Sequence, residues 1–259
     1  MIRACSPWVT FSQLIVIIAI IIFSIDYVYA ARAFSFPYEA TIAHVDEREY
    51  EQWVTWRADK DVDPAFDRFD IRHELEFGMT ERWQLAFYAD WRYQDGNSVD
   101  DGAEFRDIAM ENIYQLADPR RDPFGFALYG EIRIGDKLLV LEPRLILQKN
   151  LGSWIFVWNG VVEAEWEGDD FNYTESKGVF ENNLGASYEL TSSVRAGVEL
   201  DHKIELKEWS DWQDHVVYIG PNIAYHGHEW WVVLTPTYQV TGINSEANFQ
   251  TRLIFGIEF

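Results

Sequence analysis

The side chains that could do chemistry in this sequence are mainly carboxylates and guanidiniums placed at every second position of otherwise apolar stretches. Successive side chains of a strand point to opposite faces, so this spacing gathers the charged groups on one face. Glutamate and arginine arranged in this way form ion pairs and select solutes by charge, but they offer no activated serine or cysteine nucleophile. The candidates for a charged interior are Glu74, Glu76, Arg133, Glu142, Arg144, Glu163, Glu165, Arg195, Glu199 and Arg252.

Histidine chemistry is weakly supported. No His-x-Ser occurs in the chain, whereas lipid hydrolases built on barrels place a serine two residues from a histidine on one strand face. His226 and His228 in the turn HGHE are spaced as a metal pair, but no cysteine or tight carboxylate cluster completes a site in the sequence. Asp201 and His202 are adjacent and therefore point to opposite faces of a strand. We predict no catalytic residue, no metal and no cofactor.

The first thirty residues have the pattern of a secretory signal peptide. Arg3 precedes the apolar stretch LIVIIAIIIFSI, and Val28 and Ala30 occupy the positions that a signal peptidase reads. A membrane anchor is the alternative, but the apolar stretch is shorter than the ~20 residues that a spanning helix needs. We predict cleavage after Ala30, with Ala33 as a second site.

Charge and cysteine content exclude several classes of function. The net charge of −22 is unchanged by removal of residues 1–30, which contain one base and one acid, Arg3 and Asp26. This acidity argues against a nucleic-acid partner. Cys5, the single cysteine, precedes the apolar stretch, so neither a lipoprotein anchor nor a disulfide is available to the mature chain.

Period-two hydrophobicity recurs along the whole mature chain, and no convincing helical periodicity is present. Most of the apolar-alternating segments have ten to thirteen residues, longer than average globular strands and suited to tilted strands that cross a membrane. We therefore predict an all-β fold, a closed antiparallel up-and-down transmembrane barrel. Its twelve strands are expected near residues 50–57, 66–77, 83–93, 105–116, 124–134, 138–149, 154–166, 179–190, 194–203, 215–226, 230–241 and 247–259.

The connections between these segments differ on the two sides of the predicted barrel. Those after odd-numbered strands are mostly long and acidic, as in EGDDFNYTES, and the others are mostly short, as in GMTE and LTSS. Outer-membrane barrels have short periplasmic turns and longer outer loops. The pattern predicts the outer membrane of a Gram-negative bacterium, both termini in the periplasm, residues 31–48 as a periplasmic segment and residues 49–259 as the barrel. Whether residues 33–48 enter the barrel stays open.

Aromatic residues support the same interpretation. Trp53, Trp83, Trp91, Trp154, Trp166 and Trp230 lie near predicted strand ends, where aromatic girdles contact lipid headgroups. The chain ends RLIFGIEF, so Phe255, Ile257 and Phe259 share an apolar face up to the last residue. This ending resembles the C-terminal signal that barrel-assembly machinery recognises, and the expected partners are that machinery, outer-membrane lipid and lipopolysaccharide.

The predicted lumen is narrow. Twelve strands ~4.8 Å apart and tilted ~40° give a backbone diameter of about 24 Å, which inward side chains largely fill. Arginine serves a packed internal network of ion pairs better than lysine does. The excess of carboxylates predicts a preference for cations if the passage is open.

Several stretches together resemble an uncharacterised family of bacterial outer-membrane barrels, which is similar to barrels assigned to transport in the phenol-degradation MetA pathway. The resemblance implies an outer-membrane location but brings no substrate and no catalytic residue. The stretches, in order, are EQWVTWRADK, FDRFDIRHELEFGMTERWQLAFYADW, DPFGFALYGEIRI, LILQKNLGSWIFVWNGVVEAEWE, ENNLGASYEL, YIGPNIAY and RLIFGIEF.

The sequence thus predicts a passive, porin-like channel for small solutes. A closed barrel with a structural or adhesive role is the alternative, and a barrel enzyme that acts on lipid is a third hypothesis. The sequence does not name the solute or the oligomeric state.

Overall fold

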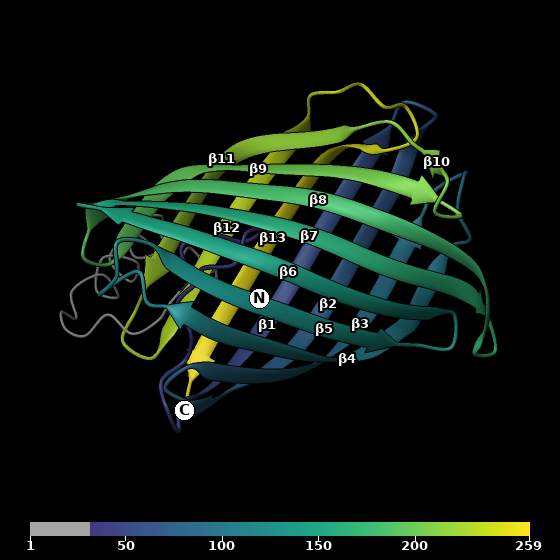
Figure 1. Ribbon diagram of the computed structural model, residues 1–259. Helices are drawn as coiled ribbons and strands as arrows, with labels where there is room; N and C mark the ends of the chain where they lie inside the picture. The colour runs from purple at the N-terminus through teal and green to yellow at the C-terminus, as the bar shows by residue number, and fades with distance from the viewer. Residues whose placement is uncertain (1–31) are drawn as a thin grey trace, which may run out of the picture.

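The structure is a computed structural model and describes residues 32–259, so the predicted signal peptide lies outside the described residues. The described chain is almost entirely β-strand (Figure 1). The strands are β1 (Arg48–Lys60), β2 (Asp63–Thr80), β3 (Trp83–Asp95), β4 (Gly102–Ala117), β5 (Gly125–Ile134), β6 (Leu138–Leu151), β7 (Trp154–Asp169), β8 (Asn172–Thr191), β9 (Val194–Lys207), β10 (Asp211–Trp212), β11 (Val216–His226), β12 (Trp230–Gln239) and β13 (Ala247–Glu258).

Twelve of these strands form one closed antiparallel barrel (Figure 1). Each long strand pairs with its neighbours in the chain, and the sheet closes where β1 pairs with β13 over residues 49–60. The two-residue β10 pairs only with the end of β9 and lies outside the barrel wall. The predicted twelve-stranded up-and-down barrel is confirmed, and each predicted strand overlaps an observed one.

The first and last strands of the wall meet at one end of the barrel, where β1 begins and β13 ends. The backbone N–H of Phe259 donates to the carbonyl oxygen of Arg48 at 3.0 Å. We call this end of the barrel, with the turns β2–β3, β4–β5, β6–β7, β8–β9 and β11–β12, the terminal end, and the opposite end the far end.

The far-end connections are shorter than the sequence predicts. Asp169 pairs with Asn172, so β7 and β8 are joined by two residues alone. Those residues, Asp170 and Phe171, both have positive φ, as the tightest hairpin turns require. The stretch EGDDFNYTES is thus mostly strand and not a long loop. Its polarity is misleading because a strand that continues beyond the apolar band has solvent on both faces.

The outer face of the wall is apolar along its length. Leu145, Ile223 and Phe255 are among its exposed large side chains. The predicted C-terminal signal belongs to this face, with Phe255, Ile257 and Phe259 37 %, 40 % and 69 % exposed. No helix among residues 32–259 is long and apolar enough to span a membrane.

The hydrophobic core lies inside the barrel, toward the terminal end. Its largest members are Phe34, Tyr38, Trp53, Ile113 and Trp231. The prediction of Trp53 as a headgroup-facing girdle residue is wrong, because its ring is 5 % exposed and faces the lumen. Trp53 and its neighbour Gln52 point to opposite faces of β1, so an error of one position in the assigned register places Trp53 on the lipid side.

Candidate functional site

Residues 32–43, which we call the lumenal segment, run through the interior of the barrel. Every second side chain of the segment is apolar and buried, namely Phe34, Phe36, Tyr38, Ala40 and Ile42. The segment forms no strand, and Pro37 lies in its middle. Proline lacks the N–H that a sheet needs, so the segment keeps the period-two pattern without joining the wall.

Side chains of the wall take up the backbone hydrogen bonds that strand pairing would otherwise supply. Asn159 on β7 accepts from the Tyr38 N–H at 2.7 Å and donates to the Tyr38 carbonyl at 2.9 Å. Ala40 is held in the same way, since its N–H donates to Gln148 at 2.7 Å and its carbonyl accepts from Gln115 at 2.6 Å. These amides satisfy buried backbone groups that would otherwise be costly to leave unpaired.

Two charged groups hold the first half of the lumenal segment. The carboxylate of Glu199 accepts from the N–H of Ser35 at 2.9 Å and from the N–H of Phe36 at 2.8 Å. The guanidinium of Arg252 donates to the Ser35 carbonyl at 3.1 Å. Glu199 is 1 % exposed, so its charge is compensated by these donors and by the hydroxyl of Thr235 at 2.8 Å.

Phe34 is seated against β8 at a glycine. A Cβ atom at Gly185 would lie 2.5 Å from the Phe34 ring, so only glycine leaves room for this side chain. Tyr38 occupies the middle of the lumen, with its hydroxyl 3.0 Å from Glu111 and its ring centroid 5.1 Å from that of Tyr129. The lumenal segment therefore makes shape-dependent contacts as well as hydrogen bonds.

The lumenal segment carries two charged residues, Arg32 at its start and Glu39 in its second half. Arg32 donates to Glu51 at 3.2 Å, and its guanidinium lies 4.7 Å from the centroid of Trp53. Burial raises the pKa of Glu39 to about 7, although Arg32 and the N–H of Ala33, which donates to its carboxylate at 3.2 Å, oppose the shift. Burial also raises the pKa of Tyr38, with the charge of Glu111 as the second cause. Glu39 is the group of the segment whose charge changes near neutral pH.

A cavity of about 490 Å³ occupies the barrel between the lumenal segment and the far end. Phe36 and Tyr38 form its floor, and Lys60, Leu138 and Glu246 lie near its far-end rim. Twelve acidic and eleven basic side chains line it, so its formal charge is nearly balanced. The cavity has room for a small polar solute surrounded by charged groups.

The charges of this cavity are separated in space. The strands β13, β1, β2 and β3 contribute six basic groups and two acidic ones, whereas the facing strands β5–β9 contribute eight acidic groups and four basic ones. The basic groups are Arg57, Lys60, Arg68, Arg72, Arg92 and Arg252, and the eight facing acids are Glu131, Glu142, Glu163, Glu165, Glu167, Glu181, Asp201 and Glu205. We call these two sides the basic wall and the acidic wall. A transverse field between them orients a dipolar solute.

Asp70 is the centre of the basic wall. Arg57, Arg68 and Arg92 all pair with this one carboxylate, with Arg68 at 3.2 Å and Arg92 at 2.7 Å. Three guanidiniums around one carboxylate leave uncompensated positive charge at the surface of the cavity. Arginine forks of this kind suit carboxylate and phosphate groups of a solute.

The residues predicted from the sequence to line the lumen occupy three places. The structure puts Arg133, Glu142, Arg144, Glu163, Glu165 and Arg252 at the cavity. Glu199 holds the lumenal segment, and Glu74 and Glu76 lie beside Glu51 on the terminal side of that segment. Arg195 lies at the terminal end, where it pairs with Glu189 at 3.1 Å and donates to the Ser153 carbonyl. The part that any of these groups takes in permeation stays a prediction.

Sequence reasoning missed the lumenal segment and the amides that hold it. The alternation of apolar residues in FSFPYEATI was the available signal, but Pro37 and the short length argue against a strand. Asn159, Gln148, Gln115 and Gln84 carry no charge, so they did not stand out among the charged inward residues.

The histidines weighed for metal chemistry are dispersed in the structure. His226 is buried and its Nε2 lies 3.1 Å from the Arg32 carbonyl, whereas His228 is exposed beside Glu229 at 3.8 Å. Asp201 lines the cavity, but His202 stacks on His215 with 2.8 Å between ring nitrogens. Neither pair thus forms a site of the type considered from the sequence.

Comparison with known proteins gives one family and several structural neighbours. The model of a family of unknown function, DUF6662, matches residues 32–253. Curated proteins give no match. Similar solved structures include the COG4313 outer membrane channel from Pseudomonas putida F1, with a TM-score of 0.63, 12 % identity and coverage of 88 % of this chain and 100 % of that chain.

Two further barrels are similar at the level of the fold. The NanC porin has a TM-score of 0.55 and 11 % identity over 81 % of this chain and 98 % of that chain. The translocator domain of the autotransporter NalP from Neisseria meningitidis has a TM-score of 0.52 and 11 % identity over 83 % of this chain and 89 % of that chain. At these identities the likeness concerns the fold alone, and it agrees with the closed antiparallel barrel.

Proposed function

We propose that this chain, which belongs to the family of unknown function DUF6662, is an outer-membrane, porin-like transporter for small solutes whose passage is set by the lumenal segment. The observation that carries the proposal is the charged cavity of about 490 Å³ inside a closed barrel. A barrel with only a structural role has no need to keep an interior of this size lined by charge.

The orientation that we propose places the terminal end in the periplasm and the far end outside. Short turns at the terminal end and the C-terminal Phe259 support this placement. Solutes then enter the cavity from outside and meet the lumenal segment before they reach the periplasm.

Passage requires the lumenal segment to move. The wall holds it through side chains and not through strand pairing, so its displacement leaves every strand ladder intact. The cost of opening is then the loss of the hydrogen bonds and packing contacts that hold the segment, rather than the unfolding of the barrel. This separation of a movable segment from a rigid wall is what a gated passage needs.

Solute selection in this proposal occurs at the two walls. The arginines around Asp70 attract an acidic group, and the acidic wall attracts a cationic or hydroxylated part of the same solute. The resemblance to barrels of the MetA pathway makes small aromatic acids the first solutes to screen. The main cavity does not support a cation preference, because its acidic and basic groups are nearly equal in number. The support comes from the terminal side of the lumenal segment, where Glu49, Glu51 and Glu76 border a small second cavity.

The test compares conductance of the refolded chain 31–259 with that of a variant lacking residues 32–43, in planar bilayers under a salt gradient. We expect small or infrequent steps from the full segment and large stable steps from the deletion variant. The double substitution Gln148→Ala and Asn159→Ala, which removes two backbone anchors, is expected to give intermediate opening.

Asn182→Ala is a matched control, because Asn182 contacts Trp158 and His202 instead of the segment. Its conductance should equal that of the parent chain. If the deletion variant is folded by circular dichroism and still conducts no ions, the transport proposal is wrong and the barrel has a structural or adhesive role.

A further inference from the structure

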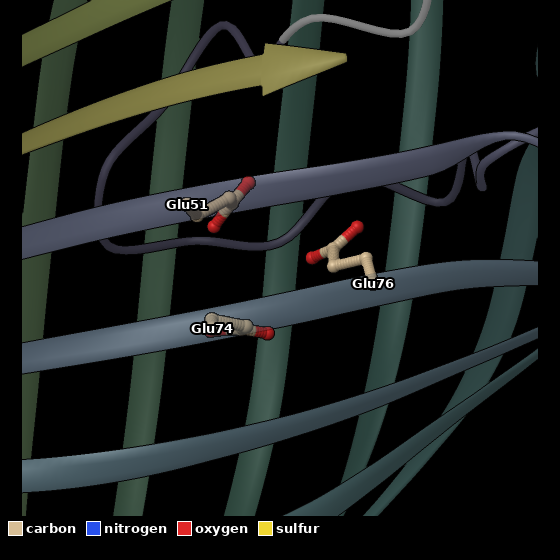
Figure 2. Close-up of side chains that lie close together, drawn as sticks. All are labelled: Glu51, Glu74 and Glu76. Atoms are coloured by element: carbon tan, nitrogen blue, oxygen red, sulfur yellow. The ribbon is translucent and has the colours of Figure 1, made fainter. Parts of the chain in front are cut away.

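Three glutamates from neighbouring strands meet inside the barrel on the terminal side of the lumenal segment. Glu51 lies on β1, and Glu74 and Glu76 lie on β2 (Figure 2). One carboxylate oxygen from each lies within 4.8 Å of the others, and all three residues are buried. Register explains the meeting, since Glu51 is paired with Glu74 across β1 and β2.

Glu74 is the member of this cluster that has no adequate protein partner. It is 0 % exposed, and neither of its carboxylate oxygens accepts a hydrogen bond from the described residues. The nearest described cation is Arg72, at 3.8 Å, but the fork of Arg72 is engaged by Asp90 at 3.0 and 3.1 Å. A buried carboxylate with free oxygens beside two further carboxylates calls for a cation.

The other two glutamates keep coordinating capacity as well. Glu51 receives Arg32 and the Trp53 indole on one oxygen, Oε2. Glu76 receives Gln84 on one oxygen, Oε2, at 2.8 Å. A carboxylate has two oxygens with about four acceptor sites, so both groups can bind an ion without giving up these bonds.

Space for an ion is present at the same place. A cavity of about 40 Å³ is lined by Glu51 and Glu76 of the cluster, together with Glu49 and with Glu39 and Thr41 of the lumenal segment. This volume is enough for an ion with a few water molecules and too small for a solute. It is separated from the main cavity by the lumenal segment, so ion binding at the cluster can be tested separately from solute binding in the main cavity.

We propose that Glu51, Glu74 and Glu76 form a binding site for a divalent cation of the Ca²⁺ class. Only oxygen donors are present in the cluster, which selects a hard cation over zinc. Ca²⁺ accepts irregular oxygen shells of variable number, whereas Mg²⁺ demands octahedral geometry at shorter distances. The sequence did not predict this cluster, because the three glutamates are brought together by strand pairing.

The site shares one ligand with the lumenal segment. Arg32 of the segment pairs with Glu51, so its positive charge competes with a bound cation for the same carboxylate. Substitutions on the two sides of this competition therefore have opposite effects on Ca²⁺ affinity. The two signs follow from charge alone, so a specific site is recognised by how much larger the effect of Glu74 is than that of a carboxylate elsewhere in the barrel.

The test is titration of the refolded chain 31–259 with Ca²⁺ alone, followed by calorimetry, in metal-free detergent. We expect one site per chain. Glu74→Gln should weaken binding at least tenfold, and Arg32→Gln should strengthen it severalfold. Glu205→Gln, a carboxylate of the acidic wall in the main cavity, is the control and should leave the affinity unchanged.

Tb³⁺ luminescence provides a second readout, because Trp53 donates its indole N–H to Glu51 and can sensitise a bound lanthanide. Excitation of tryptophan should give Tb³⁺ emission that Ca²⁺ displaces and that Glu74→Gln removes. Glu76→Gln serves if the Glu74 variant does not fold. The site would be overturned by absence of Ca²⁺ binding in the parent chain. It would also be overturned if folded Glu74→Gln and Glu76→Gln variants bound Ca²⁺ as tightly as the parent chain. Neither result would bear on conductance.

Discussion

The two halves of the lumen are built on different principles. The half toward the terminal end is packed like the core of a globular protein, with Phe34, Tyr38 and Trp231 fully or almost fully buried. The half toward the far end is an open cavity lined by ion pairs such as Arg133 with Glu163 at 3.4 Å. Residues 32–43 fill the packed half together with inward side chains such as Trp231, whereas the strand pairing of the wall is the same in both halves.

This contrast separates two functions that a simple pore combines. In the transport function that we propose, the open half recognises a solute by charge and the packed half determines whether the solute passes. Packing is sensitive to single methylene groups, whereas exposed ion pairs contribute little each. Substitutions in the packed half should therefore change the opening of the barrel, and those in the open half should change its selectivity.

The largest effect is expected from Phe34→Ala. Loss of a buried phenylalanine costs about 3–5 kcal/mol in a packed site, and here that loss falls on docking of the lumenal segment rather than on the wall. The lower value corresponds to a rise of roughly 100-fold in the undocked population. Single-channel recording should show this as a large increase in open time.

Phe156→Ala is the matched control for Phe34→Ala. Phe156 is 41 % exposed on the outer face and does not touch the lumenal segment. An equal change in open time for both variants would contradict the assignment of Phe34 to the gate.

Substitution of two glutamates of the acidic wall is expected to change ion selectivity without changing the opening of the barrel. Glu163 pairs with Arg133 and Glu165 pairs with Lys177, both at 3.4 Å, and both line the main cavity. Replacing both by lysine shifts four charges and should move the reversal potential toward anions.

The same double change at Glu81 and Glu175, which are exposed outside the cavity, provides the comparison. Its reversal potential should stay near that of the parent chain. Unchanged selectivity in the Glu163 and Glu165 variant would remove these residues from the permeation path.

The smallest effect is a pH dependence of opening that originates at Glu39. Its pKa is about 7 when the segment is docked, chiefly through burial, and returns toward its ordinary value when the segment is released. A raised pKa in the docked state stabilises docking at low pH and loses that contribution as pH rises from about 4.5 to 7. Open time should therefore increase from pH 5 to pH 8, by up to roughly 70-fold for a pKa change of this size.

Glu39→Gln tests this dependence, because glutamine has no charge to lose. The ionisable groups around Glu39 are Arg32, Arg195 and Glu199, with Glu49, Glu51 and Glu76 in the same small cavity, and all of them are retained in the variant. Its open time should be nearly flat over the same pH range, whereas Asp46→Asn, an exposed carboxylate nearby, should behave like the parent chain. A steep profile in the Glu39 variant would assign the effect to another group.

The sequence by itself determined the wall of this protein. Period-two alternation is a local property, so the twelve long strands and the outward face of Phe255 and Ile257 could be predicted from residue order alone. The inward placement of Glu142, Arg144 and Glu163 follows from the same alternation. Prediction from local polarity was wrong where a strand extends beyond the apolar band, as at the start of β8, which the sequence assigns to a loop.

The tertiary structure alone decided what fills the wall. The lumenal segment contacts Asn222, Asn159 and Gln148 from strands that lie more than a hundred residues along the chain, as the separations of 189, 121 and 108 residues record. The cluster of Glu51, Glu74 and Glu76 likewise depends on the register between β1 and β2. Closure of the sheet brings such residues together, and no pattern within a strand encodes which residues will face each other across the lumen.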